Sequence, residues 1–248
     1  MNQTPDPLNR YELQRVAANQ AAAVVRINGE VAVVREGFLT MAFVWMFVGL
    51  LLSAATTYLT MTNPDVLKFA VGNLLILFLV ELGFVVAVSG FVNRLGAVVA
   101  LGLFFGFALL NGLTLGIVVY AQTAVSGWAG VTSAFLGASA IFGSAALYGV
   151  ITKRDLMRLG GILTMGLIGL LVVMVVNIFL GSSTIDFVIG IAGVAIFTGL
   201  TAWDVQRIQR GYLGNIRDRE SASVVGALAL YLDFVNLFLM MLRLFSRR

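Results

Sequence analysis

Residues 95–152 read LGAVVALGLFFGFALLNGLTLGIVVYAQTAVSGWAGVTSAFLGASAIFGSAALYGVIT, a stretch without a single charged side chain. A helix needs about 20 apolar residues to cross the ~30 Å hydrocarbon core of a bilayer. The stretch is long enough for two such helices, and we expect the chain to turn at its more polar middle, residues 122–127. It therefore predicts two membrane-spanning helices, over residues 95–120 and 129–151.

Five further segments outside this stretch have the same character. They cover residues 37–61, 69–92, 159–180, 185–204 and 224–244. None shows the period-two alternation that is typical of a membrane β-barrel. We expect an all-α polytopic membrane protein, with seven transmembrane helices over residues 37–248. Residues 1–36 precede them as an amphipathic interfacial segment or a frayed tail.

Composition excludes several classes of protein. Hydrophobic residues make up 60% of the chain and charged residues only 11%, where a soluble domain carries about 25% charged residues. The chain has no Cys and no His, which excludes disulfides, zinc–thiolate sites, thiol nucleophiles and Ser-His-Asp catalysis. We expect no enzyme, no cofactor and no nucleic-acid partner, and any proton chemistry must rest on carboxyl groups.

The basic residues predict the orientation in the membrane. With the N-terminus in the cytoplasm, 12 of the 16 Lys and Arg residues lie in the inner segments, as the positive-inside rule favours. The C-terminal end conflicts with this, because seven crossings place Arg243, Arg247 and Arg248 outside. Either the earlier loops decide the orientation or segment 224–244 is re-entrant, and we favour seven crossings.

Three acidic residues of the predicted spans stand out: Glu81, Asp204 and Asp233. An ionisable group at membrane depth costs several kcal/mol, so it is a candidate for function. Asp233 lies near the middle of its span on a stripe of small residues, three residues before Asn236. Asp204 lies at the end of its span, where the alternative role is an interfacial pair with Arg207 or Arg210.

The sequence leaves open whether Asp204 and Asp233 meet. The two carboxyl groups lie at the same depth in the membrane if the chain between the two helices turns at Asp218–Arg219. If it turns at Gly214–Asn215, they are offset by about 10 Å at 1.5 Å per residue, and a tilt or kink must close that gap. Two adjacent carboxyl groups would titrate as a unit, and their oxygens suit calcium.

The run Ala227–Leu244, ALALYLDFVNLFLMMLRL, resembles the terminal signature of the Bax inhibitor-1 family. Three shorter segments resemble the same family in the right order. They are Val80–Gly83 of its second helix, Tyr148–Gly160 after its fourth, and Trp203–Ile208 at the end of its sixth.

The resemblance implies a bacterial plasma-membrane protein with its last helix central among the others, acting as a pH-sensitive calcium leak. It implies that Asp204 and Asp233 share a proton, gate a pore and bind calcium weakly. It further implies that Glu81 lies near the pathway and that a basic residue of the second-helix region, Arg94, acts as a latch. Asn236 is an additional pathway candidate because of its place beside Asp233.

Three functions compete. The first is a calcium-permeable, acid-sensitive channel whose partners are lipid, calcium and protons. The second is a non-conducting membrane regulator that binds membrane proteases or cell-death factors. The third is an intramembrane aspartyl protease. We disfavour it because residues 199–203, GLTAW, which precede Asp204, lack the Gly-x-Gly motif expected before the aspartate in that class.

The orientation can be tested directly, because the native chain contains no cysteine. Single cysteines at Arg154 or Arg217 should react only with reagents that reach the cytoplasmic side, since both lie in basic segments that we expect inside. Labelling of either position from outside intact cells would contradict the topology.

Overall fold

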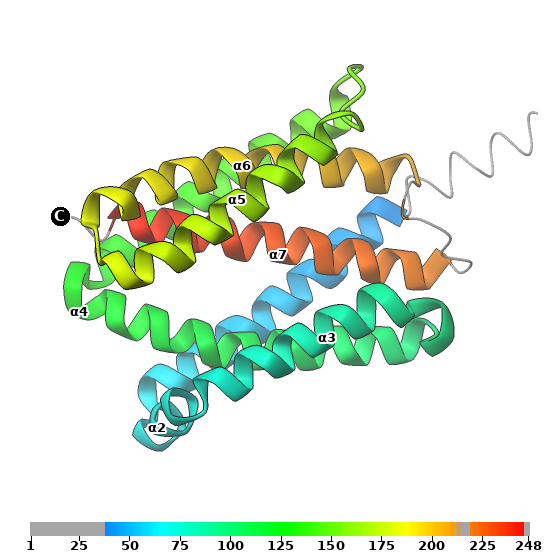
Figure 1. The fold of residues 1–248 in the computed structure, drawn as a ribbon. Helices are drawn as coiled ribbons and strands as arrows, with labels where there is room; N and C mark the ends of the chain where they lie inside the picture. The colour runs from blue at the N-terminus through cyan, green and yellow to red at the C-terminus, as the bar shows by residue number, and fades with distance from the viewer. Residues whose placement is uncertain (1–37, 212, 214–218, 246–248) are drawn as a thin grey trace, which may run out of the picture. The chain divides into compact units, whose positions relative to one another are not determined.

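The computed structural model describes residues 38–211, 213 and 219–245. The N-terminal segment, residues 1–36, lies outside the described residues. The described part is helical and contains no strand. Its helices are Phe38–Thr62 (the first helix, blue in Figure 1), α2 (Pro64–Gly72), α3 (Leu74–Leu95), α4 (Ala97–Ile151), α5 (Leu159–Leu180), α6 (Ser183–Gln209) and α7 (Arg219–Phe245).

The long helix α4 is interrupted at Gly127. The residue has φ 64° and ψ −177°, a conformation that is open to glycine and costly for other residues. The chain reverses there, so the two parts of α4 form two crossing segments (Figure 1). Together with the five other long apolar helices, the described residues contain seven crossing segments, which confirms the predicted fold class.

The second predicted span begins in the wrong place. The sequence predicts that this span begins at residue 69. In the structure, α3 begins at Leu74 and the short helix α2 precedes it. Asn63 caps α2, because its Oδ1 accepts hydrogen bonds from the backbone N–H groups of Asp65 and Val66 at 3.0 and 3.3 Å. Asn and Pro at such positions are helix-start signals, which a hydropathy pattern does not detect.

The last helix, α7, is central in the fold. In its most apolar 18-residue stretch 72% of the residues are buried, against 39% in α6 and 6% in α5. It packs most extensively against α4 and α6, and it runs through the middle of the helices in Figure 1. The structure therefore confirms the central position of α7.

Helix α7 is long and apolar enough to cross a membrane, and it does not turn back within the described residues. It is continuous from Arg219 to Phe245, which corresponds to about 40 Å at 1.5 Å per residue. Arg243, at its end, pairs with Asp186 at the beginning of α6, so α6 and α7 are antiparallel. This pairing also neutralises one of the three arginines that conflicted with the positive-inside count.

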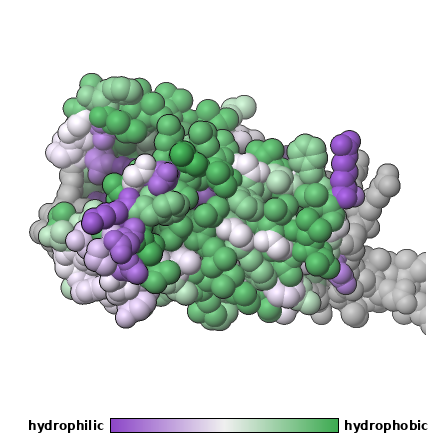
Figure 2. All heavy atoms as spheres, turned by 90° about the horizontal axis from the view of Figure 1, so that it is seen from below, coloured by the Kyte–Doolittle hydropathy of each residue, from purple (hydrophilic) through white to green (hydrophobic). Residues whose placement is uncertain are grey.

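The basic segments that we expect inside lie together at one end of the helices. The α3–α4 turn with Arg94, the α4–α5 loop and the end of α6 all lie at the right of Figure 1. The face shown in Figure 2 is mostly hydrophobic between more hydrophilic ends. These features match a protein embedded in lipid between two polar interfaces.

The sequence has two GxxxG pairs in α4, Gly102 with Gly106 and Gly112 with Gly116, and both glycines of the second pair pack against the first helix. In the first pair only Gly106 is in contact, because a Cβ there would lie 3.2 Å from Phe84 of α3. A Cβ at Gly112 would lie 2.6 Å from the backbone O of Ser53, and a Cβ at Gly116 would lie 2.5 Å from the side chain of Thr60. Nothing lies within 4 Å of the corresponding position at Gly102. The close approach also lets Ser53 and Thr57 donate hydrogen bonds to the backbone O atoms of Ala108 and Gly112, at 2.7 and 2.9 Å.

Gly112→Ala should destabilise the protein by about 1–3 kcal/mol, because the new methyl group forces the first helix away from α4. The matched control is Gly102→Ala, which adds the same methyl group where there is room and should be neutral or slightly stabilising. The apparent melting temperature in detergent measures both. Equal melting temperatures for the two variants would contradict the assignment of this contact.

Candidate functional site

The carboxyl groups of Asp204 in α6 and Asp233 in α7 lie within hydrogen-bonding reach of each other. Both residues are buried, with exposed fractions of 7% and 5%. Oδ2 of Asp233 receives no hydrogen bond from an N–H or O–H group of the described residues. The structure therefore brings together the two aspartates whose distance the sequence left open.

The two aspartates meet although they lie at different depths along their helices. Asp204 is five residues from the end of α6, and Asp233 is fourteen residues from the start of α7 at the same end. A helical side chain tilts toward the N-terminus of its own helix. Because α6 and α7 are antiparallel, Asp204 tilts deeper and Asp233 tilts back toward the end. These directions help to close the offset between the two carboxyl groups.

Arg207 is the cation of this site. Its Nη2 lies 2.7 Å from Oδ1 of Asp204, one helical turn away, and its guanidinium carbon lies 4.4 Å from the ring centroid of Trp203. Stacking on an aromatic face and pairing with a carboxylate both suit the planar guanidinium. Trp203 and Asp204 therefore fix the position of Arg207.

Arg94, the latch candidate from the sequence, occupies a different place. It lies in the last turn of α3 and is exposed. In the described residues, the arginine that pairs with Asp204 is Arg207. The sequence had offered Arg207 only as the alternative, interfacial partner of that aspartate.

The arrangement determines where the proton lies. Two carboxyl groups form a hydrogen bond only when one of them carries a proton. Arg207 is paired with Asp204, and its positive charge favours the ionised form of that carboxyl group, so we expect the proton of such a pair on Asp233. In this state the three side chains together carry no net charge.

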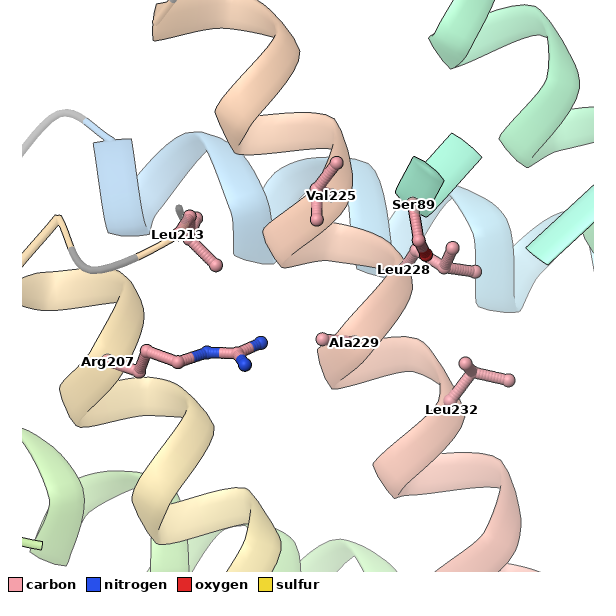
Figure 3. Close-up of a pocket in the computed structure, with 7 residues that line it drawn as sticks. All are labelled: Ser89, Arg207, Leu213, Val225, Leu228, Ala229 and Leu232. Carbon is pink, nitrogen blue, oxygen red and sulfur yellow. The ribbon is translucent and has the colours of Figure 1, made fainter. Parts of the chain in front are cut away.

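A cavity of about 470 Å³ lies beside this site, where α3, α6 and α7 approach each other. Figure 3 shows Arg207 extending from α6 toward Ala229 of α7, and Ser89 of α3 beyond the α7 ribbon in this view, next to Leu228. Most of the remaining wall is apolar and comes from α7. Arg207 is the one charged side chain among the described residues that line it.

Glu81 belongs to a second polar cluster, on α3 and α4. Its Oε2 accepts a hydrogen bond from Asn111 at 3.2 Å, and its Oε1 accepts one from Thr114 at 3.0 Å. The hydroxyl of Tyr231 in α7 donates to Oδ1 of Asn111 at 2.9 Å and lies 2.6 Å from Oγ of Ser53. This buried chain of hydrogen bonds joins the first helix, α3, α4 and α7.

Asn236 lies with Glu81 in a second cavity of about 640 Å³. The Nδ2 group of Asn236 donates to the backbone O of Leu232 at 2.8 Å. The candidates thus fall into two groups, Asp204 with Asp233 and Glu81 with Asn236. The sequence did not predict the partners of Glu81, because only the packing of α3 on α4 brings Asn111 and Thr114 to it.

Gln206 fixes the end of α6 to the α4–α5 loop. Its Oε1 accepts a hydrogen bond from the backbone N–H of Leu156, and its Nε2 donates to the backbone O of Arg154, both at 2.9 Å. Arg210 adds an ion pair with Asp155 at 2.7 Å, but that pair is partly exposed and contributes little. Gln206 is 2% exposed, so it is the main polar link between the loop and the turn that carries Asp204.

Comparisons with known proteins agree with this architecture. A family profile described as "Inhibitor of apoptosis-promoting Bax1" matches residues 35–248. The chain is 38% identical over 213 residues to an uncharacterized protein of Deinococcus radiodurans, covering 85% of this chain and 90% of that protein. It is 37% identical over 220 residues to the inner membrane protein YbhL of Escherichia coli, covering 86% and 92%. An uncharacterized protein of Borreliella burgdorferi is 37% identical over 224 residues, covering 87% and 94%.

Gln206→Leu should lower stability by about 1–3 kcal/mol for each buried backbone group that it leaves unpaired. The matched control is Gln209→Leu in the next turn, because the structure shows no side-chain hydrogen bond from Gln209 to a described residue. Limited proteolysis at residues 152–158 and the melting temperature in detergent report the effect. If the two variants lose equal stability, Gln206 does not hold the loop.

Proposed function

The chain belongs to the Bax inhibitor-1 family, and on that premise we propose that it is a pH-sensitive, calcium-permeable leak of the bacterial plasma membrane. The observation that carries the proposal is the buried pair of Asp204 and Asp233, whose carboxyl groups lie within hydrogen-bonding reach of each other, with Arg207 beside them. The location in the plasma membrane follows the E. coli relative, which is named an inner membrane protein.

The cost of burial explains why such a pair suits a gate. Removing one partner from a buried, charged network costs about 3–5 kcal/mol, because the other partner is left without compensation. The closed arrangement is therefore stable only while one proton is shared and Arg207 is paired. A change in protonation removes one of these interactions and favours a rearrangement of α6 against α7.

The two directions of pH change act differently. Raising the pH removes the shared proton, so that two adjacent carboxylates repel each other and α6 and α7 separate. Lowering the pH adds a second proton, which neutralises Asp204, weakens its pairing with Arg207 and lowers the affinity for a cation. Flux should therefore depend on pH through two steps that belong to the pair.

Calcium fits this site as a passing ion. Carboxylate oxygens are suitable ligands, but tight calcium sites use six to eight oxygens. Among the described residues, no three acidic side chains gather in one place. In our proposal the aspartates bind calcium weakly and water supplies the other ligands, which favours passage over storage.

Asp233→Asn should flatten the pH dependence of calcium entry, because it retains size and hydrogen bonding but removes the titrating group. Asp204→Asn should do the same, and the double variant should be no worse than either single variant, since the two act as a unit. The measurement is calcium entry into dye-loaded liposomes over a range of about pH 5 to 8, analysed for two steps that belong to the pair.

Asp186→Asn is the matched control. Asp186 is also in α6, but it pairs with Arg243 at the opposite end, so its variant should keep the wild-type pH profile. If Asp233→Asn shows wild-type flux with an unchanged profile, the aspartate gate is wrong. If wild-type liposomes show no flux at any pH, the alternative of a non-conducting regulator that binds membrane proteases or cell-death factors takes its place.

A further inference from the structure

Two cavities lie end to end along one face of α7. The cavity beside Arg207 is lined by Val225, Leu228, Ala229 and Leu232 of α7, and the cavity beside Glu81 by Leu232, Val235, Asn236 and Leu239. Helix α3 forms the facing wall of both, with Ser89 in the first and Leu82 and Val85 in the second. Leu232 is common to the two, so they form one α3–α7 groove with Leu232 at its middle.

The α3–α7 groove is longer than the hydrocarbon layer of one leaflet. From Val225 to Leu239 it follows α7 for fourteen residues, which is about 21 Å at 1.5 Å per residue, where one leaflet contributes about 15 Å of hydrocarbon. Leu232 is also the midpoint of α7, and the far cavity reaches Leu74 and Leu75 at the start of α3. The groove therefore continues past the middle of the membrane toward the opposite interface.

The polarity of the groove changes along its length. The deep part has mainly apolar walls, and the α3 side chains at its edge, Leu75 and Phe78, are 71% and 58% exposed. The carboxyl group of Glu81 is engaged by Asn111 and Thr114 of α4. The deep part thus offers a hydrocarbon-like surface that is open toward the lipid.

The other end of the groove offers the guanidinium of Arg207, in the last turn of α6. A guanidinium has five N–H donors, and Nη2 of Arg207 lies in the ion pair with Asp204. Its Nε is buried without a hydrogen-bond partner among the described residues, so it has no surface that a molecule in the groove can reach. The N–H groups of Nη1 are the donors left for such a molecule, and a phosphate matches the geometry of arginine.

We infer that the α3–α7 groove binds one phospholipid with an anionic headgroup. The phosphate lies at Arg207, near Ser89, and one acyl chain extends past Leu232 into the cavity beside Glu81 and Asn236. The phosphate accepts hydrogen bonds from Nη1 of Arg207, the terminal nitrogen outside the ion pair with Asp204, and the acyl chain fills the apolar space that water would occupy poorly. This binding does not require ion conduction and is measured without an ion gradient.

The experiment uses the full-length, delipidated protein in detergent and native mass spectrometry. Phosphatidylglycerol and phosphatidylcholine with the same two acyl chains are the competing probes. The wild type should retain one phosphatidylglycerol in preference to phosphatidylcholine. Arg207→Gln should weaken that binding about tenfold or more, as expected for the loss of one charge-assisted hydrogen bond. Inorganic phosphate should not displace the lipid, because it lacks the acyl chains.

Two further variants make the result decisive. Arg210→Gln is the matched control, because Arg210 pairs with Asp155 outside the groove, and it should keep the preference. Leu232→Trp blocks the middle of the groove without altering Arg207, and it should abolish retention of the long-chain lipid; it decides the question if Arg207→Gln does not fold. Equal binding of the two lipids by the wild type, equal losses in Arg207→Gln and Arg210→Gln, or full retention by Leu232→Trp would overturn the inference.

Discussion

A carboxyl group deep in a membrane protein must share a proton or pair with a cation, and Asp233 imposes this requirement on the most buried helix of the fold. Its partner is Asp204, and the partner of Asp204 is Arg207. The ring of Trp203 supports Arg207, and Gln206 fixes the same turn to the α4–α5 loop. The arrangement of the last turns of α6 is thus linked to the partner that the buried carboxyl group of Asp233 requires.

The spans could be predicted because charge is excluded from the hydrocarbon core, and this constraint leaves a clear pattern in the sequence. The break at Gly127 was visible as a polar interval in residues 122–127. The boundary between α2 and α3 was missed because it depends on hydrogen bonding at Asn63 and on the end of a helix at Asn73. Both lie in a region that is apolar overall, where hydropathy carries little information about local geometry.

The site was predictable to a different extent at each residue. Asp204 and Asp233 were identifiable from their depth alone, and the pairing of Asp204 with Arg207 was among the alternatives at helical spacing. Their contact was not, since it depends on side-chain direction in two antiparallel helices. The hydrogen bonds of Glu81 were also inaccessible, because Asn111 lies thirty residues away on another helix.

The central position of α7 has a consequence for how the protein is made. The helices that surround it are all earlier in the chain, so each is synthesised before the helix that it must pack against. Until α7 arrives, the surfaces that bury Leu237 and Tyr231 in the finished protein face lipid or one another. Biogenesis therefore passes through an incomplete ring of helices, and assembly is completed when α7 enters it.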